Sequence, residues 1–138
     1  MEEGVIRAIC VSERKGTEKR PVGEAVVETD WGIEGDAHAG RWHRQVSLLA
    51  KERIDEFNAE GAGVSFGAFG ENLVTEGFDP TLFPIGTVIV SGDVVLQVTQ
   101  IGKKCHSGCA IEQRMGRCIM PNNGVFSKVL FGGTLREG

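Results

Sequence analysis

The residues best suited to chemistry are cysteines, and three of the four lie between residues 100 and 133. They are Cys105, Cys109 and Cys118. The same stretch carries basic side chains, although the formal net charge of the whole chain is −4: Lys103, Lys104, His106, Arg114, Arg117 and Lys128. A cysteine is a strong nucleophile or soft-metal ligand only as its thiolate, which nearby cations stabilise. The pattern therefore predicts a reactive thiol in this stretch.

Cys105 is the best candidate for that thiol. It follows Lys103 and Lys104, and a short helix is expected a few residues later, at 110–115. Cations and the N-terminus of a helix both favour the thiolate form. The alternative is an inert, partly buried thiol beside a solvated pair of lysines, and spacing alone leaves both interpretations open.

A zinc site is a further possibility in this stretch. It offers four sulfur and nitrogen ligands, the number that a structural zinc requires: Cys105, His106, Cys109 and Cys118. The spacing fits poorly, because three residues separate the first two cysteines and the adjacent Cys105 and His106 rarely bind one ion. The fourth cysteine, Cys10, lies in a strand-like run, where it is either a functional thiol or a small buried hydrophobe.

A second cluster of functional side chains lies in the segment 32–45. Glycines there let the backbone approach a ligand closely, and planar guanidinium groups suit phosphate or carboxylate. The charged and titratable side chains are Glu34, Asp36, His38, Arg41, His43 and Arg44. His38, His43 or His106 could serve as the base of a catalytic cysteine. The other interpretation is a solvated turn whose aspartate and glycines set its geometry.

The composition indicates one β-rich domain over residues 1–138. Glycine supplies 20 of the 138 residues, about twice its usual share of roughly 7%, as is typical of many tight turns. A negative net charge argues against a nucleic-acid surface. No apolar run approaches the length of about 20 residues that spans a bilayer, and the N-terminus lacks a secretory signal. We therefore expect a cytoplasmic protein with neither nucleic acid nor membrane as partner.

Hydrophobic patterning predicts about six to seven short strands and two short helices, which is typical of a barrel or sandwich. The strands are expected at 5–12, 25–29, 45–49, 72–75, 87–90, 94–99 and 125–131, the last closed by Gly132 and Gly133. Besides the helix at 110–115, one is expected at 50–59, where Ala50, Ile54 and Phe57 share a helix face.

Three blocks of sequence resemble the MOSC domain family, which takes its name from the C-terminal domain of molybdenum cofactor sulfurase. They are residues 35–40 with 43–49, residues 69–73, and residues 98–105. The resemblance is closest to short, stand-alone bacterial members. It implies a distorted β-barrel, and it places the hallmark cysteine of the family at Cys105.

The resemblance also implies roles for individual residues. In the family, the hallmark cysteine is thought to carry sulfur as a persulfide, or to bind molybdenum itself. Cys105 is thus the expected sulfur carrier or metal ligand, and His38 and His43 are candidates for proton transfer or hydrogen bonding. The molybdenum cofactor (molybdopterin), bound stably or transiently, is expected to meet basic side chains: Arg41, Arg44, Lys103, Lys104 and Arg117.

Partners follow from the same resemblance. A chain of 138 residues is too short to include the pyridoxal-phosphate domain of a cysteine desulfurase, so a partner desulfurase would supply the sulfur. The acceptor would be a molybdoenzyme or a protein of molybdenum cofactor biosynthesis. Two alternatives stay open: a molybdenum-dependent reductase of N-hydroxylated compounds, and a non-catalytic module that binds or chaperones the cofactor.

Overall fold

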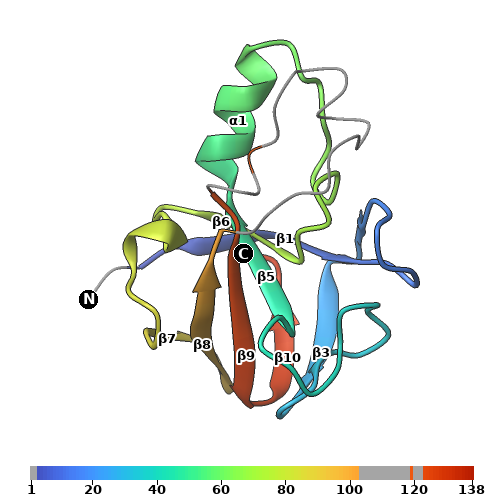
Figure 1. Cartoon of the computed structure of the whole chain (residues 1–138), viewed down its shortest axis with the longest axis vertical. Helices are drawn as coiled ribbons and strands as arrows, with labels where there is room; N and C mark the ends of the chain where they lie inside the picture. Colours follow the sequence, from blue (N-terminus) through green and yellow to red (C-terminus); the bar gives the residue numbers. More distant parts are fainter. Residues whose placement is uncertain (1–2, 103–118, 120–122) are drawn as a thin grey trace.

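The computed structural model describes residues 3–102, 119 and 123–138, and these residues form a mostly β, curled fold (Figure 1). The larger sheet has the order β2-β1-β6-β5-β9-β8-β7. Its strands are β1 (Val5–Val11), β2 (Arg20–Pro21), β5 (Val46–Ala50), β6 (Leu73–Glu76), β7 (Val88–Ser91), β8 (Val94–Ile101) and β9 (Val125–Phe131). The predicted barrel-like β fold is confirmed. The helix predicted at 110–115 lies outside the described residues.

A smaller sheet has the order β10-β3-β4. Its strands are β3 (Glu24–Glu28), β4 (Gly32–Ile33) and β10 (Gly133–Arg136). β4 leads into the segment 32–45, so this sheet holds one end of the second predicted cluster. The other end enters β5, a central strand that pairs in parallel with β6 and antiparallel with β9.

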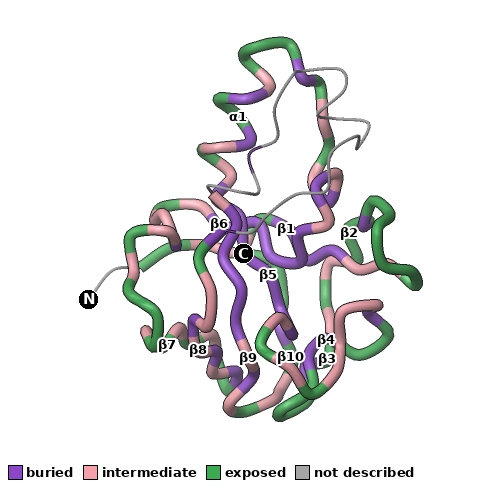
Figure 2. Tube along the Cα trace, in the orientation of Figure 1, coloured by how far each residue is buried: buried purple, intermediate pink, exposed green. Residues whose placement is uncertain are grey.

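β5 is buried along its whole length, and its two faces contribute to two different cores. Leu48 belongs to the apolar cluster that both sheets share, whereas Leu49 packs beneath α1 (Lys51–Ala59). This division follows from the strand geometry, in which successive side chains point to opposite faces. Ile54 and Phe57, predicted to share a helix face, are both fully buried there. Figure 2 shows buried stretches of α1 alternating with half-buried and exposed ones.

The prediction that the strand 125–131 is the last one is wrong. After β9 the chain turns at Gly132 and forms β10, which pairs antiparallel with β3 from Gly133 opposite Val27 to Arg136 opposite Glu24. A Cβ on Gly132 would lie 2.3 Å from the carbonyl oxygen of Val27. The glycine therefore permits a close crossing from one sheet to the other.

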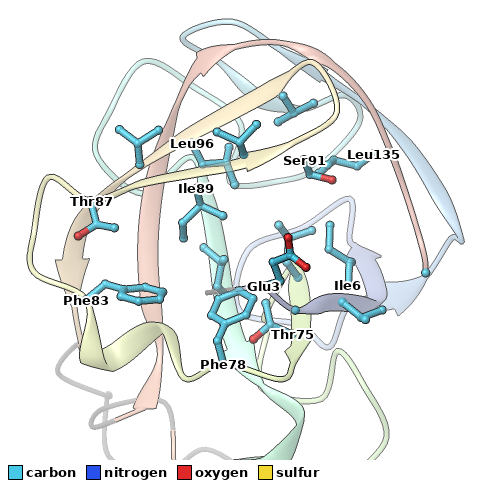
Figure 3. A pocket seen from close by; sticks show the side chains of 18 residues that line it. Glu3, Ile6, Thr75, Phe78, Phe83, Thr87, Ile89, Ser91, Leu96 and Leu135 are labelled. Carbon is cyan, nitrogen blue, oxygen red and sulfur yellow. The ribbon is translucent and has the colours of Figure 1, made fainter. Parts of the chain in front are cut away.

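The predicted strands 87–90 and 94–99 are present as β7 and β8, which form an antiparallel hairpin with Ser91 opposite Val94 and Gly92 in the turn at a φ of 58°. A cavity of about 610 Å³ lies beside it (Figure 3). The cavity is largely apolar, and Phe78 and Phe83 flank η1 (Pro80–Leu82) on its wall. No helix in the described part of the chain is long and apolar enough to cross a membrane.

Candidate functional site

Two predicted site residues, His43 and Arg44, meet at the C-terminal end of β8. The Nε2 atom of His43 lies 3.0 Å from Oε1 of Gln100, and Nε of Arg44 donates to the same oxygen at 3.0 Å. The amide nitrogen of Gln100 donates to the carbonyl oxygen of Gly102 at 2.8 Å, which orients the amide. Because that oxygen accepts only, Nε2 of His43 is the donor in this bond.

Arg44 is the cation best placed to bind an anion in this cluster. Its guanidinium lies over the ring of Phe126, with 5.0 Å between the central carbon and the ring centroid. It forms no ion pair with a carboxylate of residues 3–102, 119 or 123–138. A half-buried guanidinium without a carboxylate partner suits a phosphate or another oxyanion.

Arg41 does not join the cluster around Gln100. Its side chain is 81% exposed, and its Nε atom lies 4.0 Å from a carboxylate oxygen of Asp30. An exposed pair at that distance contributes little to stability. The structure thus separates two arginines that the sequence analysis treated alike.

His38 lies at a buried ion pair. The Nζ atom of Lys19 is 2.7 Å from Oδ1 of Asp36, and both side chains are 0% exposed. The same nitrogen lies 2.9 Å from Nδ1 of His38 and 3.1 Å from the hydroxyl oxygen of Ser12. The other carboxylate oxygen of Asp36 accepts from the backbone N–H of His38 at 3.2 Å. Lys19 therefore connects the loop 12–19 to the second predicted cluster.

Sequence reasoning missed both Lys19 and Gln100. Lys19 lies in a polar loop with two other basic residues, Arg14 and Lys15, and no spacing distinguishes it from them. The position of Gln100 is a signal, since it directly follows the predicted strand 94–99 and begins the stretch that holds the three cysteines. That position would have been sufficient reason to include Gln100 among the predicted site residues.

A second buried carboxylate, Glu71, is linked to Lys19 through the backbone of Gly67. Its oxygens accept from the backbone N–H groups of Gly67 at 2.9 Å and Phe69 at 3.0 Å. The carbonyl oxygen of Gly67 in turn accepts from the N–H of Lys19 at 2.8 Å. Burial raises the pKa of Glu71 to about 7, although these backbone donors and the charge of Lys19 oppose the increase.

This carboxyl group predicts a pH-dependent stability. Glu71 binds its proton below a pKa of about 7 in the folded state and below about 4.5 when unfolded. Between these values the folded state holds an extra proton, so the free energy of unfolding should fall as the pH rises, by at most about 3 kcal/mol. Urea unfolding of the wild type and of Glu71→Gln across this window measures the effect as the difference between the two proteins. If the free energies of unfolding of the two proteins changed with pH in parallel, the prediction for Glu71 would be refuted.

Of the two interpretations of Cys10, a functional thiol or a small buried hydrophobe, the structure supports the second. Its side chain is fully buried in the core beneath α1. Burial raises the pKa of its thiol to about 12, the charges of Glu71 and Glu137 add to the increase, and Lys19 opposes it. A thiol of this kind is neither a nucleophile nor a metal ligand at neutral pH.

The remaining predicted site residues lie outside the described part of the chain: Cys105, Lys103, Lys104 and Arg117, together with His106, Cys109 and Cys118 of the zinc hypothesis. Among residues 3–102, 119 and 123–138, no group of three or more His, Cys, Asp and Glu side chains could hold a metal ion. The cavity beside β7 is lined by none of the predicted site residues. It is therefore separate from the cluster around Gln100.

Comparison with solved structures shows what the fold is similar to. The YuaD protein of Bacillus subtilis superposes with a TM-score of 0.79 at 17% identity, covering 100% of this chain and 95% of that one. YiiM of Geobacillus stearothermophilus superposes with a TM-score of 0.73 at 21% identity, covering 99% of this chain and 72% of that one. YiiM of Escherichia coli superposes with a TM-score of 0.64 at 20% identity, covering 97% of this chain and 66% of that one. These identities show similarity of fold alone.

Comparison with curated proteins found no match. The family model for the MOSC domain matches residues 35–132, which is most of the chain and includes Gln100, Cys105 and all of the second predicted cluster except residues 32–34. The three sequence blocks and the curled β fold agree with that match. The chain belongs to the MOSC domain family.

Proposed function

We propose that this protein handles the molybdenum cofactor, with which the MOSC family is associated, and that Cys105 carries sulfur for it as a persulfide. One observation carries the proposal: His43 and Arg44 both bind Gln100, at the end of the strand that leads to Cys105. Cys105 follows Gly102 by three residues, and three residues of chain span at most about 11 Å. The proposal is that His43 and Arg44 act on this thiol.

The charges near this strand end suit an anionic ligand. Arg44 has no carboxylate partner in the described residues, and Lys103 and Lys104 follow Gly102 directly in the sequence. Cations lower the free energy of a thiolate or persulfide anion, and a guanidinium binds phosphate with two parallel hydrogen bonds. Arg44 would hold the phosphate of the pterin cofactor, and the lysines would stabilise the sulfur anion.

The proposed sulfur step balances without a further oxidant. The thiolate of Cys105 attacks the outer sulfur of a persulfide on a partner cysteine desulfurase. A sulfur–sulfur bond forms on Cys105, the bond in the donor breaks, and the donor cysteine leaves as a thiolate. Pyridoxal phosphate belongs to that partner, which releases sulfur from free cysteine.

Molybdenum binding by Cys105 is the alternative form of the same proposal, because thiolates are soft ligands that suit molybdenum bonded to sulfur. When bound, the cofactor would supply a redox-active metal centre. Arg44 would again anchor its phosphate, with His43 held beside it by Gln100.

Intact mass spectrometry tests the sulfur-carrier proposal. The protein is incubated with a cysteine desulfurase, pyridoxal phosphate and cysteine, and its mass is measured without reductant. We expect a gain equal to one sulfur atom, which peptide mapping places on Cys105 and which dithiothreitol removes. No gain, or a gain mapped to another cysteine, would reject Cys105 as the carrier.

Elemental analysis separates the carrier from the alternatives. Protein produced in a host that makes the cofactor should contain far less than one molybdenum per chain if Cys105 is only a sulfur carrier. Stoichiometric molybdenum would favour the reductase of N-hydroxylated compounds or the cofactor-binding module. Reduction of an amidoxime with a supplied electron donor would then distinguish these two.

The two arginines of the segment 32–45 provide a matched pair of variants. Arg44→Met should weaken retention of the cofactor about 10- to 100-fold, because a charge-assisted hydrogen bond contributes about 1.5–3 kcal/mol. Arg41→Met should change it less than about threefold, since Arg41 is 81% exposed and lies 4.0 Å from its partner. Cofactor released from a molybdoenzyme is the probe, and pterin fluorescence after gel filtration measures retention. Equal losses in the two variants would contradict the assignment.

A further inference from the structure

The ammonium group of Lys19 has three acceptors around it. An ammonium has three N–H donors. Nζ of Lys19 lies 2.7 Å from Oδ1 of Asp36, 2.9 Å from Nδ1 of His38 and 3.1 Å from the hydroxyl oxygen of Ser12. With the side chain of Lys19 fully buried, each donor that lacked an acceptor would cost about 1–3 kcal/mol.

The direction of two of these bonds follows from their partners. The hydroxyl of Ser12 donates its proton to the carbonyl oxygen of Arg14 at 2.9 Å, so its oxygen accepts from Lys19. The carboxylate of Asp36 accepts only, and it also accepts from the backbone N–H of Ser12 at 3.1 Å. The open question is the proton between Lys19 and His38. Either the ammonium donates to Nδ1, or Nδ1 donates to a neutral amine.

The chemistry of the two groups decides where that proton lies. A lysine amine ordinarily holds its proton about four pH units more tightly than an imidazole. The carboxylate of Asp36, 2.7 Å away, supplies the countercharge that a buried ammonium requires. The ammonium therefore keeps its third proton and donates it to Nδ1 of His38.

We infer that Lys19 is a positioning residue that holds His38 as the neutral imidazole with its proton on Nε2. Backbone and ring contacts hold the imidazole in place as well. The indole N–H of Trp42 donates to the carbonyl oxygen of His38 at 2.8 Å. The two rings are nearly parallel, with 5° between their planes and 6.3 Å between their centroids.

This state assigns a role to His38. An imidazole whose Nδ1 already accepts from an ammonium acts through Nε2 as a hydrogen-bond donor, and it does not take a proton from a thiol. Phosphate oxygens and sulfur anions are the acceptors that such a donor suits. The role toward the ligand rests on the proposed function, whereas the protonation state of His38 does not.

Nitrogen-15 NMR of the wild-type protein at neutral pH tests the inference. Long-range correlations between ring protons and ring nitrogens distinguish a bare nitrogen from a protonated one. The chain has three histidines, and the signals of His38 are those lost in His38→Gln. We expect a bare Nδ1 and a protonated Nε2. A protonated Nδ1, alone or together with Nε2, would overturn the inference.

A second measurement on the same sample tests the charge of Lys19. A spectrum selective for ammonium groups should contain a slowly exchanging signal for its buried Nζ with three attached protons. A neutral amine at this position would overturn the inference. Lys15→Met, which removes a lysine of the same loop, is the control that should leave the protonation of both groups unchanged. Neither measurement depends on sulfur transfer or on the cofactor, so failure here is distinct from failure of the proposed function.

Discussion

Replacing Cys105 with serine is expected to abolish the sulfur gain that a cysteine desulfurase produces. A hydroxyl group cannot form a persulfide, because attack on the donor requires a sulfur nucleophile that is ionised near neutral pH. The measurement is the intact mass of wild type and Cys105→Ser after the same incubation. We expect a gain of one sulfur atom in the wild type and none in the variant.

Cys10 provides the matched control for this prediction. Its side chain is 0% exposed, and its pKa is raised to about 12, so it is protonated and inaccessible at neutral pH. Cys10→Ala should therefore gain sulfur to the same extent as the wild type. Sulfur that still accumulates on Cys105→Ser would show that Cys109 or Cys118 is the acceptor thiol, and the proposal would fail.

Replacing Lys19 with methionine is expected to reduce the free energy of unfolding by about 3–5 kcal/mol. Methionine occupies a similar volume but cannot donate, so the buried carboxylate of Asp36 would lose its countercharge at 2.7 Å. Ser12 and His38 would lose a donor at the same time. Urea unfolding followed by circular dichroism gives the free energy of unfolding by linear extrapolation.

Lys15→Met is the control for the stability prediction. Lys15 is exposed, and its ammonium lies 4.7 Å from the ring centroid of Trp42. Such a contact contributes about 0.5–1 kcal/mol at an exposed site. The two lysines come from one loop and contact the same segment of the chain, so burial of the ion pair is the main difference between them. A loss below about 1 kcal/mol in Lys19→Met would show that Asp36 does not depend on Lys19.

Much of the fold could be predicted because its signals are local. The alternation of β8, the apolar run of β5 and the spacing of Ile54 and Phe57 each lie within one short window of sequence. The seven predicted strands correspond to β1, β3, β5, β6, β7, β8 and β9. Hydrophobic periodicity identifies such elements without knowledge of their partners.

The strands that were missed depend on distant partners. β10 carries the pair Gly133 and Thr134, which is typical of a turn, yet it pairs with Val27 and Val26 more than a hundred residues earlier. β2 and β4 have two residues each and show no periodicity of their own. Strand pairing across such separations overrides weak local preference.

The sequence by itself determined the family, the mostly β fold and the types of side chain available for chemistry: a basic cysteine segment and a segment with two histidines and two arginines. Only the tertiary structure decided which of these side chains have partners. It buried Lys19 against Asp36 and His38, joined His43 and Arg44 through Gln100, and left Arg41 exposed. Hydrogen bonds between residues 17 to 57 positions apart depend on strand register and loop path. These are properties of the folded chain that no local pattern of residues encodes.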